Sequence, residues 1–209
     1  MELPPLQHAV IKWCKWFYSI PKNIHPALDS IGVHSSINQK DRDLWFLAGS
    51  FGNIEPVRRR CIIPSGRSIL FPIIEKEDSF SEDADLKTES ELIKRCTNAM
   101  DKILHMKAIV NGQRIKPQRI LSPVFDLNFP ENNVYDIQPG RTRSVCDGYW
   151  VFLEPLSRGK HNIEFMGEAT LEDAIAQQER ADQVYEEIWA NIDDKNTFCL
   201  NISYDIMVL

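Results

Sequence analysis

The feature that most constrains the fold is a succession of short apolar segments separated by turn residues. The clearest is residues 198–209, in which apolar and polar side chains alternate. A period of two places successive side chains on opposite faces of a strand. We therefore expect a closing strand with one buried face, which carries Leu200, Ile202, Tyr204, Ile206 and Val208.

Further apolar segments of strand length precede this one. They comprise residues 44–48, 61–64, 68–74, 108–110, 113–115, 122–129, 145–154 and 160–166. Asn111-Gly112 joins two of them, because this dipeptide readily adopts the two positive φ angles of a tight hairpin. About eight or nine short strands with frequent turns predict an α+β, β-rich fold, either an antiparallel β-sandwich or an open barrel of the jelly-roll type.

Three amphipathic helices are expected, at residues 6–18, 89–105 and 170–192, because apolar residues recur there at steps of three and four. Thr88 and Glu91 form a capping-box pattern at the start of the second. The third lies between two C-terminal strands and resembles an insertion. It is therefore a candidate lid or oligomer contact, and the space beneath it is the first place where a pocket is expected.

The chain is expected to form one domain over residues 1–209, since its length and a hydrophobic content of 43% suffice for one core. The expected parts are an N-terminal helix with an irregular connection (1–43), a β-rich core that contains the helix 89–105 (44–167), the inserted helix (168–196) and the closing strand (197–209).

The charge balance argues against a general nucleic-acid binder. Lys and Arg number 24 against 30 Asp and Glu, for a net charge of −6, whereas nucleic-acid-binding surfaces are basic. One basic run, Arg58-Arg59-Arg60, stands against this background. Because apolar residues follow it directly, we interpret it as the solvated start of a strand rather than as a phosphate clamp.

The N-terminal segment has an acid at position two and no basic leader, which is not typical of a signal peptide. No uncharged apolar stretch is long enough to span a membrane. A soluble, cytoplasmic protein is expected. The five cysteines have no C-x-x-C spacing and an odd count, so they are predicted to be reduced and mostly buried.

Four segments resemble a family of small uncharacterised proteins, many of whose members are secreted microbial proteins. They are WFLAGSFG at 45–52, IPSGRSILFPI at 63–73, LKTESEL at 86–92 and SVCDGYWVFLEPLSRGKHNIEF at 144–165. The resemblance covers residues 8–166 and the final strand, and it implies no established activity and no catalytic residue. Two departures from the family pattern are expected: no signal peptide, and an added helix at 170–192.

No cofactor and no metal site is expected. The five histidines are dispersed without metal-ligand spacing. Residues 75–85 are strongly acidic but contain no glycine for a calcium loop, so we interpret them as a solvated loop. A metal site stays open as an alternative for Glu75 and Glu77, which directly follow the buried strand expected at residues 68–74.

Three residues are candidates for acid/base catalysis. Asp147 precedes a buried segment, and Glu77 leaves a buried strand end, where burial could raise the pKa of a carboxyl group. His161 shares a strand face with Ile163 and Phe165 and could stand at the mouth of a pocket. Structural roles for all three remain the alternative: a turn or bulge at Asp147, a solvated loop at Glu77 and a satisfied histidine at the strand start.

Five residues are candidates for ligand binding. Trp45, Tyr149 and Trp150 lie on strands that also carry polar groups and could line an aromatic cavity. Arg67, in a Pro-Ser-Gly turn, could pair with an anion, and Glu154 follows the same strand as the aromatic pair. An ordinary turn is the alternative for Arg67.

Three functions follow from these features. The first is a small-molecule-binding β-sandwich, with a cofactor-independent hydrolase, isomerase or cyclase activity on an apolar or aromatic substrate left open. The second is a non-catalytic binding or assembly module, such as a homodimer, that uses its aromatic helices. The third is a carbohydrate-binding sandwich, which would need exposed aromatic side chains.

Overall fold

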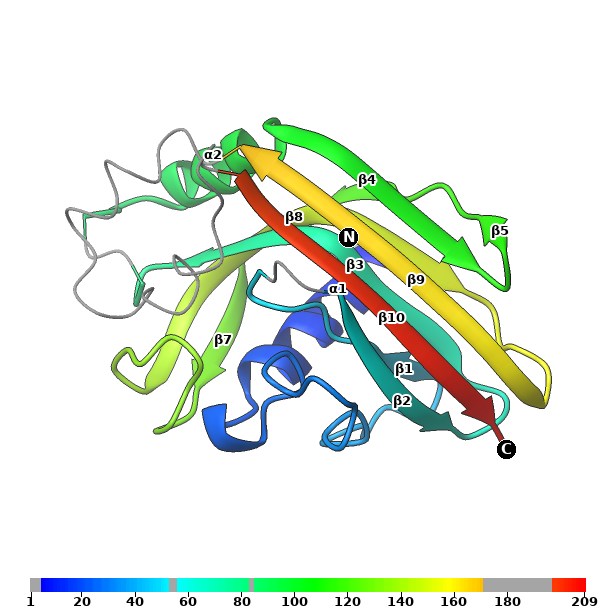
Figure 1. Cartoon of the computed structure of the whole chain (residues 1–209). Coiled ribbons are helices and arrows are strands. Elements are labelled where there is room, and N and C mark those ends of the chain that lie inside the picture. Colours follow the sequence, from blue (N-terminus) through cyan, green and yellow to red (C-terminus); the bar gives the residue numbers. More distant parts are fainter. Residues whose placement is uncertain (1–4, 53–55, 83–84, 171–196) are drawn as a thin grey trace.

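The structure is a computed structural model, and it describes residues 5–52, 56–82, 85–170 and 197–209. Two five-stranded sheets pack together in a sandwich-like arrangement that does not close into a barrel, and two α-helices accompany them (Figure 1). The predicted β-rich α+β class is confirmed. The sheets are mixed rather than purely antiparallel, because each contains one parallel strand pair.

Sheet A has the strand order β1-β3-β8-β6, and β7 pairs with another part of β8. Its long antiparallel pair, β3 with β8, forms the centre, while β1 runs parallel to β3. Its strands are β1 (Leu44–Phe46), β3 (Ser68–Ser79), β6 (Gln118–Leu121), β7 (Phe125–Phe129) and β8 (Gly140–Leu153).

Sheet B has the order β2-β10-β9-β4-β5, with β10 lying between β9 and β2 (Figure 1). Its strands are β2 (Val57–Ile63), β4 (Ile103–Val110), β5 (Gln113–Arg114), β9 (Gly159–Thr170) and β10 (Thr197–Val208). The predicted buried face of β10 is confirmed, since its five alternating apolar side chains are all buried. They meet apolar residues of β3 and β9 between the two sheets. The predicted hairpin is also confirmed, because Asn111 and Gly112 have φ angles of 50° and 80°.

Helix α1 (Pro5–Tyr18) covers one face of sheet A, as the predicted helix at 6–18 requires. Its aromatic side chains pack into the core rather than outward, with Trp13 and Trp150 in edge-to-face contact at 5.2 Å between ring centroids. Burying such rings contributes about 2–3 kcal/mol each. The helix is therefore held mainly by its own sheet.

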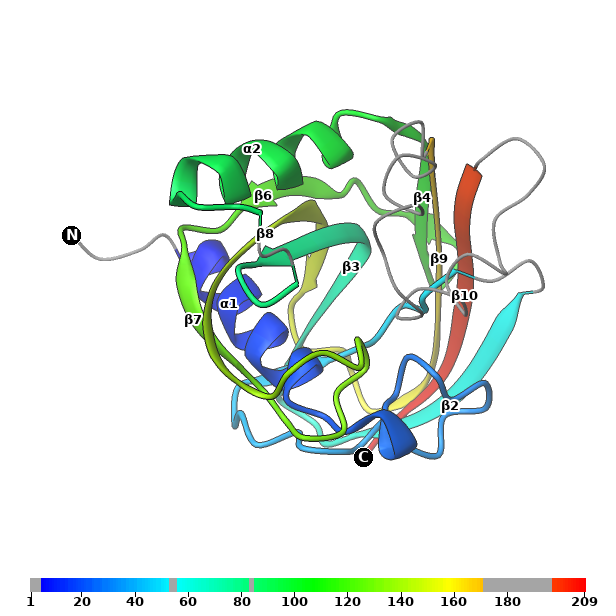
Figure 2. The ribbon, with the colours of Figure 1, turned by 90° about the vertical axis from the view of Figure 1, so that its left-hand side faces the viewer.

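Helix α2 (Glu89–Met100) lies on the opposite face of sheet A from α1 (Figure 2). Both hydrogen bonds of the predicted capping box are present at Thr88 and Glu91. The predicted end at residue 105 is wrong: the helix stops at Met100, and β4 begins at Ile103. The apolar residues Ile103 and Leu104 continue the helical spacing, but both belong to β4, in which Ile103 pairs with Ala169 of β9. The helix predicted at 170–192 lies outside the described residues.

The interpretation of residues 75–85 as a solvated loop is wrong for its first part. Glu75, Lys76, Glu77, Asp78 and Ser79 continue β3 and pair with β8. Acidic side chains lower the intrinsic strand propensity of residues 75–79, but the backbone hydrogen bonds to β8 outweigh this propensity. Buried carboxyl groups therefore line the end of β3.

The basic run on β2 is solvated at its first and third positions only. Arg58 and Arg60 are exposed, whereas Arg59 is 1% exposed. Its guanidinium donates to the carbonyl oxygens of Ala48 and Gly49, both at 2.8 Å. A buried cation needs such acceptors, so these hydrogen bonds hold Ala48 and Gly49, just after β1, against Arg59 of β2.

None of the helices in the described part of the chain has the length and apolar character needed to cross a membrane.

Candidate functional site

An open edge of β3 is the structural origin of the candidate site. Strand β1 pairs with β3 only from Ser68 to Leu70, and β3 continues to Ser79. Among the described residues, no strand pairs with this edge beyond Leu70. The sheet is therefore interrupted where the two layers face each other, and this gap leaves room for a cavity.

A cavity of about 490 Å³ runs along this edge. This volume falls in the range of small-molecule sites. Its walls come from the end of α1, residues 49–51, the open edge of β3, one face of α2 and the adjoining ends of β9 and β10. Ala169, Thr170 and Phe198, at those strand ends, line it. The helix expected at 170–192 lies outside the described residues, so a pocket beneath it stays a prediction.

Glu75 is a polar residue among the apolar side chains that α1, β3 and β10 contribute to the cavity wall. Its Oε1 accepts a hydrogen bond from the Tyr18 hydroxyl at 3.1 Å, and the Tyr135 hydroxyl contacts that of Tyr18 at 3.2 Å. The Cys146 thiol donates to Glu75 Oε2 at 3.4 Å. All three partners are buried, whereas Glu75 is partly exposed and lines the cavity. The carboxyl group is thus held in place on a residue that borders the cavity.

Burial raises the pKa of Glu75 from 4.5 to about 7. The hydrogen bonds from Cys146 and Tyr18 favour the charged carboxylate and oppose this effect without cancelling it. Burial also raises the pKa values of Tyr18 and Cys146, so both stay protonated as donors near neutral pH. Glu75 is therefore the member of this network that exchanges a proton near pH 7.

Two local features of the sheet create the space for Glu75. The register of β3 shifts between Pro72 and Ile74, which is a β-bulge. Gly148 lies opposite Glu75 on β8, and a Cβ atom on Gly148 would stand 2.6 Å from that of Glu75. The Asp-Gly pair expected at a turn or bulge is instead inside a strand, where only glycine fits this approach.

A second carboxyl pair lies further along β3. Glu77 and Glu82 have their pKa values raised, Glu77 strongly, first by burial. The negative charge of Glu82 raises the pKa of Glu77 further, and Ser144 donates a hydrogen bond to Glu77. Two close carboxyl groups cannot both ionise cheaply, so this pair holds at least one proton at neutral pH.

The wall formed by α2 has a different character. Residues at helical spacing on one face reach the cavity, and they are Glu91, Lys94, Arg95, Asn98, Ala99 and Lys102, the last just beyond the helix end. Leu86, before the helix, and Met100, at its end, also line the cavity. The buried face of α2, with Leu92, Cys96 and Met100, rests on sheet A. The cavity therefore has an apolar wall with Glu75 and a polar, mainly cationic wall.

Of the predicted catalytic residues, Glu77 lines the cavity and the other two do not. Asp147 is fully buried against Arg119, with a distance of 2.7 Å between its Oδ2 and Nη2. This pair joins β6 and β8 to the end of α2, because Arg119 also donates to the Thr97 carbonyl. His161 has the predicted inward face, but it contacts Asn111 and the Ser157 carbonyl. Both side chains have structural partners there.

The predicted ligand-binding residues do not line this cavity. Arg67 lies over the Trp45 ring, with 5.4 Å from its guanidinium carbon to the ring centroid, and it donates to the Gln39 carbonyl. Trp45 itself is buried in the core between the two sheets. Tyr149 lies beside Arg119, with 5.9 Å from its ring centroid to the guanidinium carbon. Trp150 packs on α1 and borders a small separate cavity of about 140 Å³. Glu154 is exposed beyond the end of β8. The aromatic content is therefore mainly core.

Sequence reasoning missed Tyr18, Tyr135 and Cys146 and left Glu75 only as a metal alternative. Tyr18 and Glu75 are 57 positions apart in the chain, and no local spacing connects them. The available signal was the alternation of acids after an apolar strand, which continues the period of two through Glu75 and Glu77.

In the part of the chain that the structure describes, no group of three or more His, Cys, Asp or Glu is arranged to hold a metal ion. The four cysteines Cys14, Cys61, Cys96 and Cys146 are buried as free thiols, as predicted, and Cys199 is partly exposed.

Comparisons with protein-family models, with curated proteins and with solved structures found no match. The family resemblance of the four sequence segments therefore stays a prediction.

Proposed function

We propose that the chain is a small-molecule-binding protein whose cavity performs cofactor-independent acid/base catalysis on an apolar substrate, with Glu75 as the proton-transferring group. The observation that carries the proposal is a partly exposed glutamate on the wall of a cavity of about 490 Å³, with a carboxyl pKa that burial raises to about 7. A general acid or base works best when its pKa lies near the working pH.

Accessibility favours Glu75 over Glu77 as the catalytic group. Glu77 is 1% exposed and hydrogen-bonded to Ser144, so it offers a substrate less surface than the partly exposed Glu75. Glu75 presents its carboxyl group to the cavity while Tyr18 and Cys146 orient it. Tyr18, Tyr135 and Cys146 are positioning residues in this proposal.

The arrangement suits an isomerase or cyclase better than a hydrolase that forms a covalent intermediate. The thiol of Cys146 is buried and its pKa is raised, which disfavours the nucleophilic thiolate. A single carboxyl group that both accepts and returns a proton is sufficient for a proton-shift reaction. The substrate would be an apolar molecule with an acidic C–H or an ionisable O–H next to Glu75.

The assembly and carbohydrate alternatives have less support. The apolar face of α1 is buried on its own sheet, so this helix is not presented to a partner. The described tryptophans, Trp13, Trp16, Trp45 and Trp150, are each at most 6% exposed and form no sugar-stacking platform.

The test is turnover in a complex substrate mixture. Purified protein is incubated with a small-molecule extract in D₂O, and compounds that change or gain deuterium are followed by mass spectrometry. We expect the wild type and a Lys160→Gln control, altered on the exposed side of β9, to convert or label the same apolar compounds. The Glu75→Gln variant should lose this conversion while it still folds. Equal conversion by Glu75→Gln, or no conversion by the wild type, would refute the proposal.

A further inference from the structure

We infer that the ligand of the cavity is an aromatic compound with a ring hydroxyl, of the phenol or naphthol class. Its ring lies against a group of aromatic side chains beside Glu75, and its hydroxyl donates a hydrogen bond to the Glu75 carboxylate. This inference rests on the proposed function and names the substrate class of the same site.

Four of the rings that line the cavity form a continuous group. This aromatic group consists of Phe17 and Tyr18 at the end of α1, Phe51, and Tyr135. Its rings contact one another in a closed circuit, with centroid distances of 5.8 Å from Phe17 to Phe51, 6.2 Å from Phe51 to Tyr135, 5.5 Å from Tyr135 to Tyr18 and 4.9 Å from Tyr18 to Phe17. A ligand ring can extend this packing, and each ring contact raises affinity about two- to tenfold beyond the effect of the apolar area that it buries.

The aromatic group and Glu75 belong to one wall of the cavity. The Tyr18 hydroxyl lies 3.1 Å from Glu75 Oε1, and the Tyr135 hydroxyl lies 3.2 Å from that of Tyr18. Trp13 adds a fifth ring to this wall, stacked on Phe17 with 4.5 Å between the centroids. A ligand ring that packs on the aromatic group therefore brings a substituent on its edge next to the Glu75 carboxyl group.

The direction of the hydrogen bonds at Glu75 favours a donor on the ligand. Tyr135 donates to Tyr18, Tyr18 donates to Glu75 Oε1, and Cys146 donates to Glu75 Oε2. The protons of these three groups are thus engaged, whereas each carboxylate oxygen can accept a second hydrogen bond. A phenolic hydroxyl supplies such a donor. It is a stronger acid than an aliphatic alcohol, so its proton moves to a carboxylate more easily.

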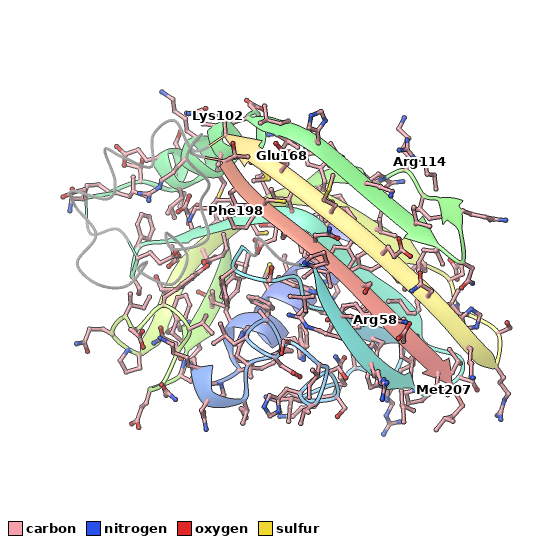
Figure 3. The ribbon with its side chains drawn as sticks, in the orientation of Figure 1. Arg58, Lys102, Arg114, Glu168, Phe198 and Met207 are labelled. Carbon is pink, nitrogen blue, oxygen red and sulfur yellow. The ribbon has the colours of Figure 1, made fainter. Side chains whose placement is uncertain are left out.

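The remainder of the lining is mixed in character and does not place the ring. At the ends of β9 and β10 it includes Phe198, and Lys102 reaches it from the turn after α2. Figure 3 shows these two residues at the same end of the molecule, far from Arg58 and Met207. Further substituents of a larger ligand would lie toward this end.

The test compares three uncharged probes: 2-naphthol, its saturated analogue decahydro-2-naphthol, and naphthalene, which lacks the hydroxyl. Binding to the full chain is measured by equilibrium dialysis at pH 8, where Glu75 is mainly ionised because its pKa is about 7. We expect 2-naphthol to bind about fivefold or more tightly than either of the other probes.

Two substitutions test the two contacts separately. Phe51→Leu keeps an apolar side chain but removes a ring, so it should lower the preference for 2-naphthol over decahydro-2-naphthol about threefold. Glu75→Gln removes the charge of the acceptor, so it should weaken 2-naphthol about fivefold and leave naphthalene unchanged. Phe152→Leu is the matched control, because this exposed ring of β8 does not line the cavity, and it should change neither preference. Phe51 is partly exposed, so its variant should remain folded, which circular dichroism checks.

Each other outcome overturns the inference. If decahydro-2-naphthol binds as tightly as 2-naphthol, or if Phe51→Leu keeps the full preference, the aromatic group does not select the ligand. If naphthalene binds as tightly as 2-naphthol, or if Glu75→Gln keeps the preference for the hydroxyl, Glu75 is not its acceptor. If no probe binds, the inference fails as a whole. In each case the turnover test with Glu75→Gln decides the proposed function independently, because it uses none of these probes.

Discussion

Replacing Glu75 by Gln isolates the electrostatic cost of the buried carboxylate. Gln has nearly the same shape and can still accept the hydrogen bond from Tyr18, but it carries no charge at any pH. The comparison of the two proteins across pH therefore removes the contributions of Glu77, Glu82 and the histidines, which both proteins share.

The magnitude follows from the pKa of Glu75. It rises from 4.5 to about 7 in the folded state, and each pH unit corresponds to about 1.4 kcal/mol, so ionisation of Glu75 costs the folded state about 3 kcal/mol. Because the folded state holds this proton more tightly than the unfolded state, the contribution is lost as pH rises. The free energy of unfolding of the wild type should fall by about 3 kcal/mol relative to the variant between pH 4.5 and 8.

The assay is urea unfolding of both proteins at pH 4.5, 5.5, 6.5, 7.5 and 8, with the denaturant dependence checked for equality. The difference between the two free energies should descend through the window from about pH 4.5 to 7 and then level off. A difference that stays constant over this range would refute the reasoning, because Glu75 would then titrate alike in both states.

Three further predictions concern the frame around the site. Gly148→Ala should lower the free energy of unfolding in urea by about 2 kcal/mol, because the new Cβ would stand 2.6 Å from the Glu75 Cβ on the opposite strand. Gly49→Ala is the control, since its nearest neighbour would be 3.8 Å away, and it should cost less. Equal costs would contradict the close approach at Gly148. Thr88→Ala should lose about 1 kcal/mol through the capping box, and no change would show that α2 does not depend on it. His25, which contacts the Phe17 carbonyl at 3.0 Å, has its pKa lowered to about 4 by burial. NMR should therefore find it neutral at pH 5.5, and the contribution of His25 to stability, which is opposite in sign to that of Glu75, should decline as pH falls from 6.5 toward 4; a charged ring at pH 5.5 would contradict this.

Much of the frame could be predicted from local patterns. The alternation in residues 198–209, the Asn111-Gly112 hairpin and the capping box at Thr88 are short-range signals, and each is present in the structure. Boundaries were less predictable where two elements share apolar character. Ile103 continues the helical spacing of α2 but pairs with Ala169 of β9.

The site depended on contacts between distant residues. Glu75 meets Tyr18 from α1 and Cys146 from β8, and Cys146 is 71 positions away in the chain. Local chemistry favoured a solvated acidic loop, because carboxyl groups are seldom buried. The aromatic residues Trp45 and Trp150 were expected in the cavity for their size, but the same size makes them core residues.

The most direct test of the central claim is the titration of Glu75 itself. Carboxyl groups labelled with ¹³C are followed by NMR from pH 4 to 9, and the Glu75 resonance is identified by its absence in Glu75→Gln. The account predicts a midpoint near pH 7. A midpoint between pH 4 and 5 would show an ordinary solvated carboxylate and would contradict Glu75 as the acid/base group of the cavity.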